Sequence, residues 1–156
     1  MKLAELMAEF AEKFGIDGFV PDKDDVYHLD ADGMAFAFAD AEDGAHFVIW
    51  AEVCPVPPEG RERLYDILMQ SMFMGQQTSG AYFSVHDGTI YLHQIEALAD
   101  MNLERFKVLL EKFISTYETW HASITDFNSV LPELTQKVQE QELESRSFEA
   151  MSLMRV

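Results

Sequence analysis

Histidine and cysteine are the residues of this sequence with the most obvious capacity for chemistry. The chain has five histidines and a single cysteine, Cys54. Zinc needs ligands that converge within about 2.0–2.3 Å of the ion, and the sequence contains neither an HxxxH nor an HExxH spacing. A cysteine nucleophile needs a neighbouring base, and the sequence nominates none for Cys54. We therefore predict no metal site and no catalytic residue.

The histidines also fall at separate places on the predicted hairpins. His86 and His93 lie on one hairpin but are offset along its strands, and a whole strand separates His28 from His46. The acidic cluster at 22–25 lacks the glycine and the distant glutamate of a calcium loop. No phosphate loop, dinucleotide fingerprint or GxSxG elbow is present. We expect a protein that is not an enzyme and uses no cofactor; a histidine-dependent metalloenzyme would instead carry stoichiometric metal.

Composition predicts one acidic, core-forming domain. Of 156 residues, 48 % are hydrophobic, and 28 Asp and Glu against 11 Lys and Arg give a formal charge of −17. Such a charge repels phosphates, so we expect no binding to nucleic acid or to anionic lipid. It favours a cationic or amphipathic partner, or it serves solubility alone. The single cysteine fits a reducing compartment, and we find no apolar stretch of about 18 residues and no membrane insertion. We expect a cytoplasmic protein.

Hydrophobic periodicity and turn signals predict an α+β domain with the order α-β-β-β-α-β-β-α, a twisted antiparallel sheet packed against helices. Asp32-Gly33 and Asp87-Gly88 are two-residue hairpin signals. The first would pair Leu29 with Phe36, and a four-residue turn at 41–44 would pair Phe38 with Phe47. The predicted helices are 3–14, 61–74 and 103–123, and the first three strands are 26–31, 34–40 and 45–53.

The two faces of the predicted three-stranded meander differ from an ordinary half-solvated sheet. Side chains alternate with period two, and one face collects large apolar residues: Tyr27, Leu29, Met34, Phe36, Phe38, Phe47 and Ile49. The opposite face should then be polar, but it is small and apolar: Ala35, Ala37, Ala39, Val48 and Trp50, with His28 and His46 at its margin. We expect a neighbouring element, a second subunit or a client chain to cover it.

The second helix carries more apolar surface than a small domain needs, and the first helix is amphipathic. The first helix is either a core helix or one wall of a client groove. The second is rich in methionine, which gives a soft, adaptable contact surface, and we expect dimerisation through it. Beyond residue 127 the composition changes to Glu, Gln and Ser. We therefore divide the chain into a domain at 1–127 and an acidic, Gln-rich, partly helical tail at 128–156 with an apolar end, which could dock on its own domain, swap to a partner subunit or remain mobile.

The element order, size and acidity resemble the class I chaperones of bacterial type III secretion (the Tir-chaperone, or CesT-like, family). The matching pieces are Lys2-Leu3-Ala4-Glu5-Leu6, Phe47-Val48-Ile49-Trp50, the prolines before Leu64-Tyr65-Asp66-Ile67-Leu68-Met69-Gln70, Thr89-Ile90-Tyr91-Leu92 and Tyr117-Glu118-Thr119-Trp120. The resemblance covers roughly residues 2–125 and rests on pattern, since no signature motif is present.

The resemblance implies a non-catalytic homodimer that binds the extended N-terminal region of a secreted effector and keeps it export-competent, without nucleotide. It makes Leu64, Leu68 and Met72 candidates for the dimer interface. The candidates for client contact are Leu3, Leu6, Met7, Phe10, Val48 and Trp50. The alternative is an acidic interaction or regulatory module of the same fold that sequesters a basic partner outside any secretion system.

Overall fold

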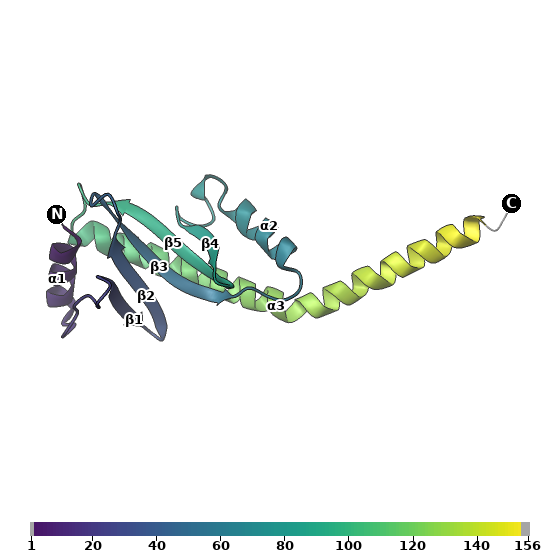
Figure 1. Cartoon of the computed structure of the whole chain (residues 1–156), viewed down its shortest axis with the longest axis horizontal. Coiled ribbons are helices and arrows are strands. Elements are labelled where there is room, and N and C mark those ends of the chain that lie inside the picture. The colour runs from purple at the N-terminus through teal and green to yellow at the C-terminus, as the bar shows by residue number, and fades with distance from the viewer. Residues whose placement is uncertain (1, 154–156) are drawn as a thin grey trace.

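A computed structural model of the chain describes residues 2–153, with side chains as far as residue 129. Its elements, labelled in Figure 1, are α1 (Leu3–Phe14), β1 (Tyr27–Ala31), β2 (Met34–Asp40), β3 (His46–Pro55), α2 (Arg61–Ser71), the 3₁₀ turn η1 (Phe73–Gly75), β4 (Tyr82–His86), β5 (Thr89–Ala97) and α3 (Leu103–Leu153). This order confirms the predicted α+β class. Among the helices of residues 2–153, none is long and apolar enough to cross a membrane.

All five strands form one antiparallel sheet in the order β1-β2-β3-β5-β4. Both predicted hairpins are present. Asp32 and Gly33 have φ of 53° and 79°, and Asp87 and Gly88 have φ of 46° and 73°, as tight two-residue turns require. The predicted pairing of Leu29 with Phe36 is confirmed.

The predicted register between β2 and β3 is wrong by two residues. Phe38 pairs with Ile49 and not with Phe47. The turn is longer than predicted because the Asp43 carboxylate accepts the backbone N–H groups of Ala45 and His46, at 2.9 and 3.1 Å, and holds both residues in the turn. A shift of two preserves the alternation of faces, so the predicted division into two faces still holds.

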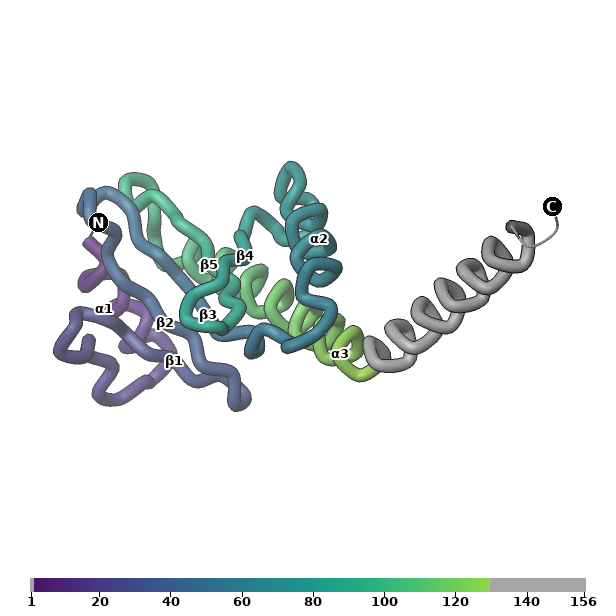
Figure 2. The backbone as a smooth tube through the Cα atoms, turned by 45° about the vertical axis from the view of Figure 1, so that its right-hand side comes forward, coloured from purple at the N-terminus to yellow at the C-terminus, as the bar shows by residue number. Residues whose placement is uncertain are grey.

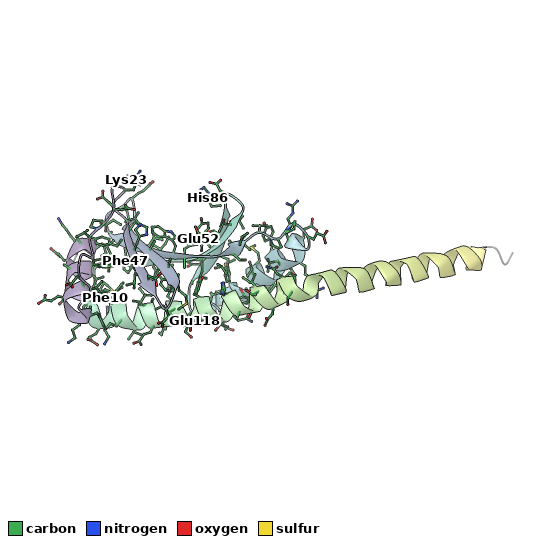
Figure 3. The ribbon with its side chains drawn as sticks, turned by 90° about the horizontal axis from the view of Figure 1, so that it is seen from below. Phe10, Lys23, Phe47, Glu52, His86 and Glu118 are labelled. Atoms are coloured by element: carbon green, nitrogen blue, oxygen red, sulfur yellow. The ribbon has the colours of Figure 1, made fainter. Side chains whose placement is uncertain are left out.

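The hydrophobic core lies between the sheet and the helices α1 and α3, which cover the same face (Figure 1). Phe106 of α3 is fully buried at its centre. Its ring centroid lies 5.3 Å from that of Phe10 on α1, 5.7 Å from that of Phe38 on β2 and 6.1 Å from that of Phe47 on β3. One side chain therefore joins both helices to the middle of the sheet. Figure 3 shows Phe10 and Phe47 at the same end of the core.

Two helix ends differ from the prediction. The second helix was expected to reach residue 74, but it ends at Ser71 because Met74 and Gly75 have φ of 54° and 67°, which no α-helix accommodates. The third helix was expected to end near residue 123, but it continues to Leu153. Ile124 is buried and Phe127 packs on the core, so the apolar stripe runs further than predicted. The side chains of the tail's apolar end lie outside the described residues, and the boundary at 127 stays a prediction.

We predict that Phe106→Ala destabilises the domain by about 3–5 kcal/mol, because it removes a buried ring and leaves a cavity. Urea unfolding followed by circular dichroism measures the free energy of unfolding. Val108→Ala on the exposed side of the same helix is the control and should change it by less than about 0.5 kcal/mol. Equal effects of the two substitutions would contradict the central position of Phe106.

Candidate functional site

The sheet face that α1 and α3 leave uncovered is called here the outer face. One cross-strand row runs across all five strands on this face: His28, Ala37, Trp50, His93 and Tyr82 are successive register partners. Trp50 lies in the middle of the row. Since its β2 neighbour is an alanine, no large β2 side chain covers the indole on that side.

A hollow of about 410 Å³ opens on the outer face where β3, β5 and β4 meet. Its lining residues are Val48, Trp50, Ser84, His86, Tyr91 and His93. Val48 and Trp50 were the two predicted client-contact residues on the sheet, and the structure places both in this hollow. His86 is one of these lining residues, and Figure 3 shows it on the side of the sheet away from α3.

Sequence reasoning missed the β4 and β5 side of the hollow. The period-two alternation of the second hairpin places Tyr82, Tyr91 and His93 on a common face. It could not show that this hairpin pairs with β3, because the pairing of Trp50 with His93 joins segments far apart in the sequence. The only available signal was the aromatic character of that face.

The outer face has acidic and aromatic groups but no permanent cation. Within the five described strands there is no lysine or arginine. Glu52 and Asp30 share the alternation of this face, and the Tyr91 hydroxyl donates a hydrogen bond of 3.2 Å to Oε1 of Glu52. Burial lowers the pKa of His93, so its imidazole is neutral at pH 7. The electrostatic potential over this face is consequently negative.

Hydrogen bonds of the Asp22 carboxylate hold the linker that follows α1 against the β1 edge of the outer face, and we call this set of bonds the Asp22 clasp. Oδ2 of Asp22 lies 2.8 Å from Nε2 of His28, and Oδ1 accepts the backbone N–H groups of Asp24 and Val26 at 2.9 and 3.0 Å. The hydrogen bond from His28, followed by the two backbone bonds, lowers the pKa of Asp22 to about 2. The charged carboxylate is therefore the form that stabilises this turn.

The α1 residues predicted to contact a client are buried in the core. Leu3, Leu6, Met7 and Phe10 are 0–5 % exposed. Their apolar stripe faces the sheet and α3, and it offers no surface to a ligand in this structure. A client could reach them only if α1 moved off the sheet.

The three residues predicted for the dimer interface differ in how deeply they are buried. Leu64 and Leu68 face the core of their own subunit, while Met72 is half-buried and its sulfur accepts the backbone N–H of Phe83 at 3.0 Å. The exposed apolar side chains lie on the other side of α2 and in η1. We call them the α2 patch: Ile67, Met69, Phe73 and Met74, which are 37, 67, 73 and 77 % exposed.

An apolar groove of about 290 Å³ continues the α2 patch toward β4. Its lining residues are Tyr65, Leu68, Met69, Met72, Phe83, Ser84, Val85 and Ile90. Figure 2 shows α2 beside β4, at the side of the domain farthest from α1. The groove and the hollow on the outer face adjoin at Ser84 of β4, which lines both.

The described side chains offer little to a metal ion or to nucleophilic catalysis. Among them, no group of three or more His, Cys, Asp or Glu residues could hold a metal. Cys54 is half-buried, and burial raises the pKa of its thiol, which disfavours the reactive thiolate.

Comparison with known proteins gives a family match. Residues 5–121 match the model of the Tir chaperone protein (CesT) family, which agrees with the span expected from the sequence. A comparison with curated protein sequences found no match.

Three solved complexes each contain a chain of similar fold. The ExsC–ExsE complex has a chain with a TM-score of 0.65 and 21 % identity, covering 78 % of this chain and 96 % of that one. The HopA1–SchA chaperone–effector complex gives 0.63 and 11 %, covering 76 % and 92 %. The ExoU–SpcU complex of the type III secretion system of Pseudomonas aeruginosa gives 0.56 and 14 %, covering 74 % and 91 %. These likenesses confirm the fold.

We predict that Asp22→Asn lowers the melting temperature at pH 7 and weakens its dependence on acid. The pKa of Asp22 falls from an ordinary 3.8 to about 2 on folding, so its contribution is present above pH 3.8 and is lost as the pH falls toward 2. Melting curves of wild type and variant should converge across that window. Asp24→Asn, an exposed neighbour, should run parallel to wild type; convergence there too would show that the effect is not specific to the Asp22 clasp.

Proposed function

Because the chain belongs to the Tir chaperone protein (CesT) family, we propose that it is a cytoplasmic homodimer that holds the extended N-terminal segment of a secreted effector. The family is one of chaperones, which confirms the prediction that the chain is not an enzyme. The observation that carries the proposal is the outer face, an apolar and aromatic sheet surface with a hollow at Trp50 that no described helix or strand covers.

An extended client suits the outer face for physical reasons. A disordered segment loses conformational entropy when it is ordered, and burial of apolar side chains, at about 25 cal/mol per Å², offsets that cost. The hollow would receive one client side chain beside Val48 and Trp50, while the client backbone follows the sheet or adds to one of the edge strands, β1 or β4. Such contacts hold a chain reversibly and leave it unfolded. One similar structure is a chaperone–effector complex and another is a heterodimeric complex from a type III secretion system, which supports an effector as the partner.

The α2 patch supports the dimer. Two methionines and a phenylalanine more than two-thirds exposed form a contiguous apolar surface at the end of the domain, and such surfaces mark interaction sites. Methionine adapts to a facing copy of itself. In such a dimer Val48 and Trp50 on β3 would remain available to a client, while the groove beside α2 meets the hollow at Ser84 of β4.

The charge of the outer face favours one second candidate, an acidic module that sequesters a basic partner outside any secretion system. A charge of −17 and strands without lysine or arginine would attract such a partner. Binding led by charge alone weakens steeply with salt, because exposed charges are screened beyond a Debye length of about 10 Å at 0.1 M. Apolar binding in the hollow does not.

We expect the double variant Met69→Glu/Phe73→Glu to be monomeric, since it places four charges in the centre of the interface of a symmetric pair. Sedimentation velocity at micromolar protein should show a dimer for wild type and a monomer of unchanged melting temperature for the variant. Val108→Glu/Glu111→Gln, on exposed positions of α3, should remain dimeric. A monomeric wild-type protein would exclude the homodimer.

Substituting Trp50→Asp should abolish client retention, because it puts a charge in the hollow and removes its largest ring. Affinity capture from host lysate at low and high salt, followed by mass spectrometry, should identify a secreted protein held by wild type at both salt concentrations and lost by the variant. Val108→Asp is the control for an added charge on the opposite side. Retention by the Trp50 variant would show that the outer face is not the site, and loss at high salt in wild type would favour the second candidate.

A further inference from the structure

The chemistry of the hollow on the outer face does not match a purely apolar ligand. Aromatic rings line it, but a carboxylate is connected to that lining through the Tyr91 hydroxyl, which bonds Oε1 of Glu52 at 3.2 Å. Glu52 is exposed and its carboxylate carries only the hydrogen bond from Tyr91 among the described side chains, so a ligand cation beside Tyr91 would give this carboxylate a charge-assisted partner that an apolar side chain cannot give. The hollow therefore favours a positively charged ligand, which a purely apolar surface would not.

The surroundings of the hollow strengthen that preference because they supply no competing cation. The chain has no lysine or arginine between Lys23 and Arg61 or between Arg63 and Arg105, and these two gaps contain all five strands. Lys23, before β1, already lies 4.0 Å from Asp24. His93, the histidine beside Trp50 in the cross-strand row, has its pKa lowered by burial. At neutral pH nothing in the described sheet neutralises Glu52.

Aromatic rings next to a free carboxylate are the usual surroundings of a bound arginine or lysine. A cation within about 6 Å of an indole or phenol ring is attracted by the ring quadrupole, and a carboxylate beside it supplies a charge-assisted hydrogen bond. Trp50 and Glu52 are two residues apart on β3, so they point to the same side about 7 Å apart. The planar guanidinium of arginine can stack on one ring and bond the carboxylate.

We infer that the hollow on the outer face binds an arginine or lysine side chain of the extended client, with its cation over Trp50 and its hydrogen bonds directed to Glu52. This inference rests on the proposed function and names the chemistry that the client must bring. Val48 lies two residues from Trp50 on the other side along β3. A client strand following β3 therefore places an apolar residue two positions from its basic residue, and arginine is preferred to lysine.

Capped synthetic peptides titrated calorimetrically into the full-length protein test the inference without a known client. The first peptide has a central arginine with valines two positions away on both sides, in a serine and glycine background. The second replaces arginine by citrulline, which has nearly the same shape and no charge. We expect the arginine peptide to bind roughly tenfold more tightly than the citrulline peptide. Glu52→Gln should bring the two affinities to within about twofold of each other, and Trp50→Leu should weaken the arginine peptide.

Glu118→Gln is the matched control, since it removes an exposed carboxylate from α3, on the other side of the sheet (Figure 3). It should leave the preference for arginine intact. Equal binding of the two peptides, no binding of either, or an equal loss in Glu52→Gln and Glu118→Gln would each overturn the inference, the last because overall charge would then explain the attraction. The proposed function is tested separately by client capture. If capture depends on Trp50 but the two peptides bind equally, the chaperone function stands and the recognition of an arginine or lysine side chain is wrong.

Discussion

The packing of Phe106 against Phe10, Phe38 and Phe47 is the contact on which the rest of this structure depends. It draws α1 and α3 onto the same face of a five-stranded sheet, and this face becomes the whole core of the domain. Tyr117 continues the same attachment farther along α3, where its hydroxyl donates to the carbonyl oxygen of Glu52 at 3.0 Å. With both helices on one side, the other side of the sheet has no cover within the described residues.

A sheet covered on one side usually has a polar free face, and here that face is used differently. Alanines on β2 leave this face without large side chains on that side of Trp50. Histidine–carboxylate pairs at Asp22 and Asp43 hold the turns beside β1 and between β2 and β3. These pairs tie the turns to the strand edges without adding a permanent positive charge. The result is a rigid, negative and partly apolar surface, which suits a chain that must be bound while it remains unfolded.

The helix α2 lies beside β4, at the other end of the domain from α1 (Figure 2). Leu64 and Leu68 are buried and attach α2 to its own domain. The Met72 sulfur accepts the backbone N–H of Phe83 on β4, and α2 and β4 together line the apolar groove. The exposed methionines then point away from the outer face. At the far end of the sheet, the Trp120 indole donates to the carbonyl of Gln77 and its ring meets Phe83 edge-on, so the loop that follows η1 is held by α3. The groove beside α2 adjoins the hollow on the outer face, because Ser84 of β4 lines both.

Local sequence determined the elements, both tight hairpins and the division of each strand into two faces, because these depend on periodicity and on turn residues a few positions apart. It also determined that Val48 and Trp50 share a face. The register across residues 41–45 was missed because Asp43 extends the turn through side-chain bonds that spacing does not reveal. Only the tertiary structure decided that His93 and Tyr91 complete the hollow, that the stripe of α1 faces inward, and which side of α2 remains bare. Each of these depends on contacts between segments distant in sequence, and an apolar stripe looks the same whether its own core or another protein covers it.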